Sequence, residues 1–171
     1  MADGIALEGM RLVKDYLPRA YKDGRDIEAR SKMLAAALMG AVAFQKGLGG
    51  VHALAHTLGA MYDKHHGLLN AVLLPYVMVR NRPAIEKNME IVANTMNLEK
   101  NNFDSVLSWV LDFRKELGIP DNLAAIGIPN GQDDLIGKMA SIDPTAGTNP
   151  ITLSPAEYGA IFCDAWNGHL Q

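Results

Sequence analysis

Apolar residues recur at steps of three and four along most of this chain of 171 residues, and this spacing predicts amphipathic helices. No run of residues alternates apolar and polar side chains as a half-buried strand does. Glycines and prolines separate one apolar segment from the next. The pattern predicts an all-α fold, a compact array of about seven to nine helices. The expected helices lie at about residues 5–17, 26–46, 51–62, 68–81, 83–96, 104–117, 133–139 and 154–166.

Local signals mark the ends of several expected helices. Pro18 is expected to limit the first helix, and Pro83 to open the fifth, because proline suits a first turn and interrupts a helix interior. Asp26 predicts an N-cap for the second helix. Ser154 and Glu157, three residues apart, predict a capping box at the start of the last helix.

The middle of the second expected helix, Met33–Phe44, is apolar on nearly every side. Such a helix is normally buried on most of its faces, so we expect it inside the core. Its twelve residues are fewer than the roughly 20 that a membrane-spanning helix needs. The first residues, Met1–Gly4, include an acid and no basic residue, unlike a signal peptide. No membrane segment is therefore expected.

Composition and charge limit the classes of function. Hydrophobic residues make up 49% of the chain and charged residues 20%, as in an ordinary soluble protein, and the length suits a single domain over residues 1–171. A net charge of −3 without a concentrated basic patch argues against nucleic acid and membrane surfaces as partners. The one cysteine, Cys163, cannot form a disulfide within the chain, which favours a cytoplasmic location.

Three histidines, His52, His56 and His66, fall within fifteen residues, and His65 stands beside the last. His52 and His56 are four residues apart and share one face of the third expected helix. Imidazole is a common metal ligand and proton carrier, so the group predicts metal or catalytic chemistry, with structural core histidines as the alternative. Ala53 stands where a zinc-protease motif needs glutamate, which excludes that class. His65 and His66 cannot both face one site from a helix, so at most one is functional there.

The segment around these histidines contains Gly49, His52, Ala53, His56, Leu58, Gly59, Ala60, Tyr62, His66, Gly67, Asn70, Ala71, Leu74 and Pro75. This pattern resembles the signature of the iron-dependent, group III alcohol dehydrogenases. The approach to the second expected helix, Asp23–Arg30, and the late turn Thr148–Pro150 are also similar to that family. The resemblance covers essentially the whole chain, and it implies the all-α C-terminal domain of these enzymes, within the dehydroquinate-synthase-like superfamily.

The resemblance implies a role for each of the three histidines. His52 and His66 match two of the family's four metal ligands, for Fe(II) or Zn(II). His56 matches the catalytic histidine near the nicotinamide and the substrate, which acts in proton relay or cofactor contact. The other two ligands, an aspartate and a histidine, belong to a segment upstream of the stretch where this chain begins. The metal polarises the oxygen of a small alcohol or aldehyde substrate.

The nucleotide-binding half of the family also lies upstream. This sequence has no glycine-rich strand–turn–helix motif for NAD(P), because Gly47, Gly49 and Gly50 follow a helix and not a strand. We therefore expect the N-terminal nucleotide-binding domain to be missing from the chain. Hydride transfer needs that cofactor, so we expect the isolated chain to be inactive.

Three positions depart from the signature. His65 and Thr57 stand where proline is frequent, and Ile151 stands where an arginine often follows the late Asn-Pro; that third change removes a contact to the other half. Two functions remain open. The chain is either part of an NAD(P)-linked alcohol dehydrogenase that joins its other half, or a stand-alone helical interaction module with a vestigial or weak metal half-site. The second function predicts a homo-oligomer formed through exposed apolar surface.

Overall fold

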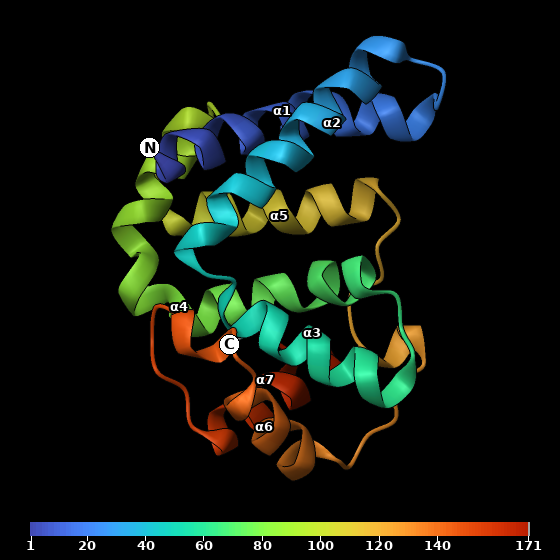
Figure 1. Ribbon diagram of the computed structural model, residues 1–171, viewed down its shortest axis with the longest axis vertical. Coiled ribbons are helices and arrows are strands. Elements are labelled where there is room, and N and C mark those ends of the chain that lie inside the picture. Colours follow the sequence, from blue (N-terminus) through green and yellow to red (C-terminus); the bar gives the residue numbers. More distant parts are fainter. Residues whose placement is uncertain (171) are drawn as a thin grey trace. The chain divides into compact units, whose positions relative to one another are not determined.

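The computed structural model describes residues 1–170, and this range contains no strand. The prediction of an all-α fold is confirmed (Figure 1). No single helix among these residues is long and apolar enough to cross a membrane, and only the bent pair formed by residues 27–46 and 49–62 passes on length and composition. The α-helices are α1 (Ala2–Lys22), α2 (Ile27–Ala43), α3 (Gly49–Tyr62), α4 (His66–Thr95), α5 (Phe103–Glu116), α6 (Asp133–Ile142) and α7 (Pro155–Asn167), and the 3₁₀ helices are η1 (Phe44–Lys46), η2 (Ala124–Ile126) and η3 (Ala146–Thr148).

Two compact units share these helices. The first unit comprises Met1–Gly47 and Glu86–Ser108, which hold α1, α2, the end of α4 and the start of α5. Within it α1 packs against α2. Gly9 lies at this contact, where a Cβ would be 3.4 Å from Met39 Cβ, an ordinary packing distance. The buried apolar residues of this unit are Leu12, Ala29, Ala36, Val92, Ala93, Met96, Phe103 and Val106.

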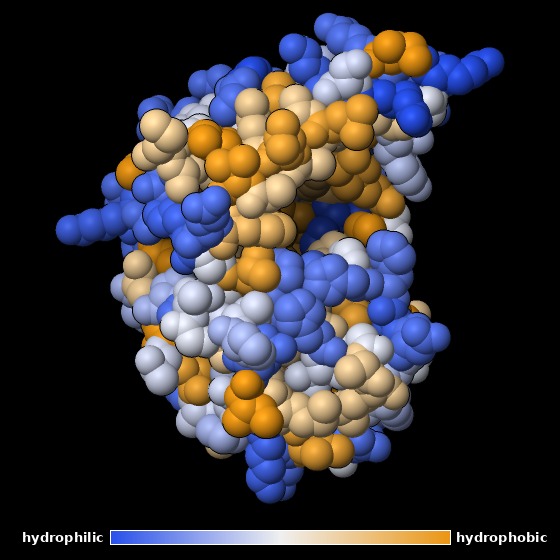
Figure 2. All heavy atoms as spheres, in the orientation of Figure 1, coloured by the Kyte–Doolittle hydropathy of each residue, from blue (hydrophilic) through white to orange (hydrophobic). Residues whose placement is uncertain are grey.

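The expectation that the middle of α2 is buried on most sides is wrong. Ala36 is buried, whereas Leu34 and Leu38 are 74% and 68% exposed. One face packs around Ala29 and Ala36, and Leu34 and Leu38 project from another face. The exposed residues Ile27, Leu34, Leu38 and Val42 recur at steps of seven and four, so they line one face of the helix. We call these four residues the α2 apolar stripe, and Figure 2 shows hydrophobic side chains gathered over this helix.

The second unit comprises Leu48–Ile85 and the chain from Trp109 onward. Within it α6 packs against α7, and both contact α3. The α6–α7 contact is close, because a Cβ at Gly137 would lie only 2.1 Å from the Pro155 carbonyl oxygen. The first half of α4 contributes to the same core. The largest buried side chains of this core include Leu54, Leu58, Leu69, Leu73, Leu123, Tyr158 and Phe162.

Helix starts are predicted correctly where a side chain makes the cap. Asp26 Oδ1 accepts a hydrogen bond from the Ala29 N–H at 3.0 Å, so Asp26 is the N-cap of α2. Ser154 and Glu157 form the predicted capping box of α7. In both cases the signal lies within four residues of sequence and needs no distant partner.

The two predictions that rest on proline are wrong. Pro18 lies inside α1, and Pro83 lies inside α4, which runs without a break from His66 to Thr95. A proline removes one N–H donor, but the helix on either side of it keeps its own hydrogen bonds. After Pro18, for example, the Asp23 N–H donates to the Arg19 carbonyl at 2.9 Å.

Candidate functional site

The start of α3 is held by the late turn Thr148–Pro150, which begins at the last residue of η3. Thr148 Oγ1 accepts hydrogen bonds from the Leu48 and Gly49 N–H groups, each at 3.1 Å. Asn149 Oδ1 accepts one from the Gly50 N–H at 3.0 Å. These side chains satisfy N–H donors that the first turn of a helix otherwise leaves unpaired. Gly49 has a φ of 70°, which glycine adopts without strain.

Asn149 also ties this turn to α4. Its Oδ1 accepts from Asn81 Nδ2 at 2.9 Å, and its Nδ2 donates to Asn81 Oδ1 at 2.8 Å. The same Nδ2 donates to the Ile151 carbonyl at 2.8 Å. Because each polar atom of the Asn149 amide has a protein partner, the start of α3 is fixed relative to α4. His52 and His56 lie on the first two turns of α3, directly after this anchor.

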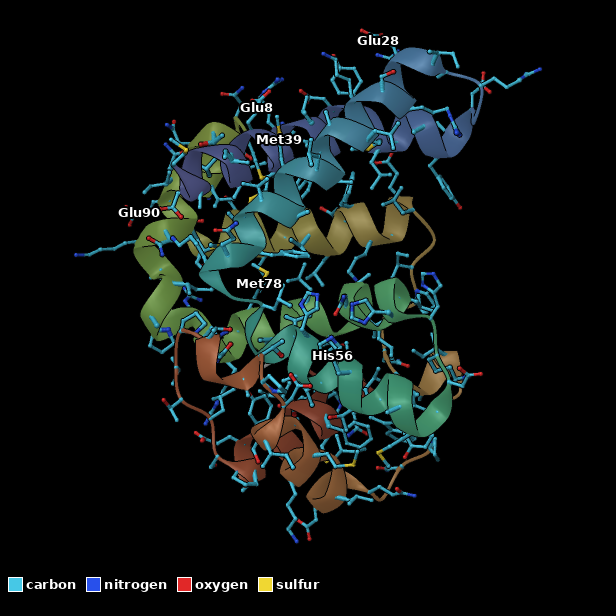
Figure 3. All side chains as sticks on the ribbon, in the orientation of Figure 1. Glu8, Glu28, Met39, His56, Met78 and Glu90 are labelled. Atoms are coloured by element: carbon cyan, nitrogen blue, oxygen red, sulfur yellow. The ribbon has the colours of Figure 1, made fainter. Side chains whose placement is uncertain are left out.

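The structure brings His52, His56 and His66 together. The ring centroid of His52 lies 5.7 Å from that of His56 and 5.2 Å from that of His66. The centroids of His56 and His66 lie 5.3 Å apart. His52 and His56 come from α3, and His66 is the first residue of α4. Figure 3 labels His56 on α3. The three histidines singled out in the sequence therefore form one cluster.

His65 has a different role from its neighbour. Its Nδ1 accepts a hydrogen bond from the Leu68 N–H at 3.3 Å, so it pairs with a backbone donor in the first turn of α4. Of the two adjacent histidines, only His66 joins the ring cluster. This agrees with the expectation that at most one of them faces the site.

Asn70 places a single atom between the two expected metal ligands. Its Nδ2 lies 3.3 Å from His52 Nε2 and 3.0 Å from His66 Nε2. Its Oδ1 is buried with no hydrogen-bond partner. The reversed amide would bury two donors without partners, which costs more than one unpaired acceptor, so the nitrogen faces the rings. The amide therefore donates to both imidazoles, and both Nε2 lone pairs point toward one position.

His56 interacts with a residue from another helix. Its Nδ1 lies 3.0 Å from Asp143 Oδ2, and the side chains are 41% and 14% exposed. Asp143 follows α6, and its Oδ1 accepts from the Thr145 N–H at 2.8 Å and from Thr145 Oγ1 at 2.5 Å. Both carboxylate oxygens of Asp143 are thus engaged.

The surroundings favour a neutral His52 and an ionised Asp143. Burial lowers the pKa of His52, and the neighbouring His66 and His56 lower it further. For Asp143, burial opposes ionisation, but hydrogen bonds from Thr145 and His56 outweigh it and lower the pKa of the carboxyl. A neutral imidazole keeps one nitrogen without hydrogen, which binding a metal requires.

The donor set fits half of a metal site. Imidazole nitrogens suit Fe(II) and Zn(II), and two of them face one position here. Among residues 1–170 no group of three or more His, Cys, Asp or Glu side chains is placed to hold one ion. That His52 and His66 are two of four metal ligands stays a prediction from the resemblance.

The sequence missed two residues of this site. Asn70 belongs to the signature, but nothing in the sequence indicated that it bridges His52 and His66. Asp143 lies 87 positions from His56, and no spacing rule connects them. A local signal existed only for the turn itself, because Asp before Pro144 and Thr145 favours a side chain that bonds the backbone two residues later.

Comparisons with known proteins support the resemblance over nearly the whole chain. Residues 1–166 match the C-terminal part of the Fe-containing alcohol dehydrogenase family. The 4-hydroxybutyrate dehydrogenase of Cupriavidus necator is 35% identical over 164 residues, which are 92% of this chain and 43% of that protein. Alcohol dehydrogenase 4 of Saccharomyces cerevisiae is 32% identical, over 97% of this chain and 44% of its own length. The crystal structure of a 1,3-propanediol oxidoreductase matches with a TM-score of 0.92 at 31% identity, over 96% of this chain and 45% of that one.

The similarity thus extends from sequence to structure. The chain spans less than half the length of these relatives, and the family match concerns their C-terminal part. The chain belongs to the iron-containing alcohol dehydrogenase family, and it corresponds to the C-terminal helical part of that family.

Proposed function

We propose that His52 and His66 supply two ligands to an Fe(II) or Zn(II) ion in an NAD(P)-linked alcohol dehydrogenase. The observation that carries this proposal is the position of Asn70 Nδ2, which is shared by the Nε2 atoms of both rings. Two Nε2 lone pairs that converge on one amide donor would also converge on one cation, which would replace that donor. The other two ligands and the nucleotide site would come from the other half of the enzyme.

A bound divalent ion supplies a Lewis acid that polarises an alcohol or carbonyl oxygen. In this chain, His52 and His66 would hold the ion. His56 adjoins both ligand rings, and we propose that it carries a proton or contacts the nicotinamide. The isolated chain lacks a nucleotide site in this proposal, so it would form no NADH or NADPH from an alcohol.

The relatives suggest a substrate class. One is called an NAD-dependent methanol dehydrogenase, from Bacillus methanolicus, and another a 1,3-propanediol dehydrogenase, from Klebsiella pneumoniae. Each is 31% identical to this chain. We propose that the complete enzyme oxidises a small alcohol or reduces the corresponding aldehyde in the cytoplasm.

Metal stoichiometry tests this proposal. The purified chain is loaded with Fe(II) under anaerobic conditions, or with Zn(II), then dialysed and analysed for bound metal. We expect about one ion per chain for the wild type and a loss for His52→Ala and His66→Ala, because two ligands from one face hold an ion better than one.

The control for this experiment is His65→Ala. It removes the histidine next to His66 and costs the helix cap at Leu68, but it leaves the ring cluster intact. We expect His65→Ala to keep its metal. If the wild type retains none, or if His65→Ala loses metal as readily as His66→Ala, the proposed half-site is wrong.

One observation favours a second function. The α2 apolar stripe exposes four apolar side chains on one helix face, and contiguous exposed apolar surface often marks an interface. A stand-alone module would cover this stripe with a second copy of the chain, whereas an enzyme half would cover it with the other half. The oligomeric state of the chain distinguishes them.

A further inference from the structure

The carboxylate of Asp143 is clamped on both sides. Its Oδ1 accepts two hydrogen bonds from Thr145, one from the N–H and one from Oγ1, and its Oδ2 faces His56 Nδ1 at 3.0 Å. Thr145 Oγ1 has only one hydrogen, which is directed at Asp143. The carboxylate therefore cannot rotate away from the imidazole without losing its contacts in the turn.

The backbone around Asp143 supports this orientation. Asp143 ends α6 with φ −62° and ψ 136°, an extended conformation that the following Pro144 favours. Its N–H donates to the Ala140 carbonyl at 3.2 Å, and its own carbonyl accepts from the Ala146 N–H at 3.0 Å. The turn is thus attached to α6 on one side and to η3 on the other.

The contact with His56 defines which ring nitrogen carries the hydrogen. An ionised carboxylate only accepts hydrogen bonds, so the partner nitrogen, Nδ1, must be the donor. In a neutral imidazole the other nitrogen, Nε2, is then without hydrogen and keeps its lone pair. A free imidazole would populate both forms.

We propose that Asp143, held by Thr145, is a positioning residue that fixes His56 with its hydrogen on Nδ1 and a free lone pair on Nε2. This form lets Nε2 accept a proton or a hydrogen bond from a neighbouring group. The inference deepens the proposed role of His56, and therefore its use in the enzyme rests on the proposed function. The tautomer itself does not depend on a metal.

Nuclear magnetic resonance of the metal-free, ¹⁵N-labelled chain tests the proposal. Long-range ¹H–¹⁵N spectra at about pH 8, above the usual imidazole pKa, report the hydrogen position in each neutral ring. We expect about a tenfold or greater excess of the Nδ1–H form for His56, because hydrogen bonds to charged groups are the stronger ones.

Two other histidines provide controls in the same spectrum. His65 Nδ1 accepts from the Leu68 N–H, so His65 should show the opposite form, with hydrogen on Nε2. His169 is exposed near the C-terminal end and gives the ratio of an imidazole in water. If wild-type His56 shows the His169 ratio or an excess of the Nε2–H form, the proposal is overturned.

Asp143→Asn provides the decisive variant because it keeps the shape of the side chain. Asn Oδ1 would keep the bonds from Thr145, so the amide Nδ2 would face His56 Nδ1 as a donor. We expect the excess to invert to the Nε2–H form. Asp143→Ala should shift His56 toward the His169 ratio, and Asp134→Ala, an exposed carboxylate on α6, should change nothing.

These variants separate positioning from stability. If the Asp143 carboxylate only stabilised the turn, its loss in the variants would lower the unfolding free energy without inverting the tautomer of His56. An unchanged Nδ1–H excess in both Asp143 variants would overturn the proposal. Metal loading of the same proteins is measured separately, so a failure to bind Fe(II) or Zn(II) would count against the proposed function and leave the tautomer result readable.

Discussion

Asn149 shows how much of the site depends on one side chain away from the histidines. Its amide makes four hydrogen bonds, to the Gly50 N–H, to both polar atoms of Asn81 and to the Ile151 carbonyl. A Cβ at Gly50 would lie only 3.1 Å from Asn149 Oδ1, so a side chain there would press on Asn149. The position of His52 thus depends on a residue almost a hundred positions away.

We predict that Asn149→Ala lowers the unfolding free energy by about 2–3 kcal/mol, because it leaves polar groups of the buried residues Asn81 and Gly50 without partners. Urea denaturation measures the change. Asn130→Ala is the control, since the exposed Asn130 bonds only the next backbone N–H in a loop, and we expect about 0.5 kcal/mol or less. Equal losses in both variants would contradict the anchoring role of Asn149.

At this scale the sequence predicted the members of the ring cluster but not their supports. His52, His56 and His66 stand out because histidine is rare, and their spacing along two consecutive helices is local. Asp143 and Asn149 reach the site only through tertiary packing, and an aspartate or asparagine in a turn is commonplace in any sequence. Such residues need coordinates, or many related sequences, to be recognised.

The close packing of α6 against α7 is the clearest constraint among the elements. Gly137 faces the first turn of α7, where its missing side chain admits the Pro155 carbonyl oxygen. We predict that Gly137→Ala destabilises the protein by about 2–3 kcal/mol, because an extra methyl group must push the helices apart. Thermal unfolding followed by circular dichroism measures this.

Gly40→Ala is the matched control for that prediction. Gly40 also lies inside a helix, α2, but a Cβ there would meet no atom within 4 Å. The better helix propensity of alanine should then raise stability by up to about 1 kcal/mol. We expect the two variants to change stability in opposite directions, and a stabilising Gly137→Ala would contradict the close packing of α6 against α7.

The capping box of α7 predicts a pH dependence. Hydrogen bonds from the Ser154 backbone and side chain, with a further one from Arg80, lower the pKa of Glu157 from 4.5 to about 2. A carboxyl whose pKa is lower in the folded state stabilises the fold above its unfolded pKa, and this contribution disappears as the pH falls. We expect the stability difference between wild type and Glu157→Gln to be largest above pH 4.5 and to shrink toward pH 2.

Denaturant midpoints of both proteins at several pH values measure this effect. Comparison with Glu157→Gln removes the contribution of other carboxyls, such as Asp26, whose pKa is also lowered. The range from about pH 5 to pH 2 brackets the unfolded and folded pKa values of Glu157. If the stability difference between wild type and Glu157→Gln stayed constant over this range, the predicted pH dependence would be wrong.

The elements also show where sequence patterns fail. Helix type and most helix starts follow from local spacing and from caps within four residues, which is why they are predicted correctly. The burial of α2 is predicted wrongly. Apolar composition shows which faces of a helix can be buried, but it does not show how many neighbouring elements pack against them. Pro18 and Pro83 mislead for a related reason: the cost of one lost hydrogen bond is local, whereas packing acts over the whole helix.

At the scale of the whole molecule, the α2 apolar stripe is the surface that we expect to form an interface. Ile27, Leu34, Leu38 and Val42 are each more than 40% exposed, and the chain covers less than half the length of its relatives. Removing two buried leucines from an interface costs about 3 kcal/mol. If a second copy covers the stripe, Leu34→Gln with Leu38→Gln should weaken self-association by about a hundredfold.

Analytical ultracentrifugation over a range of concentrations measures that association. Ile142→Gln is the control, because Ile142 lies at the end of α6 and outside the stripe. Its side chain is 82% exposed, the highest value after Met1 among the large apolar residues. A wild-type oligomer that the double variant dissociates and Ile142→Gln does not would favour the stand-alone module. A chain that stays monomeric at high concentration, with or without the substitutions, would exclude a second copy as the cover and favour the other half of the enzyme.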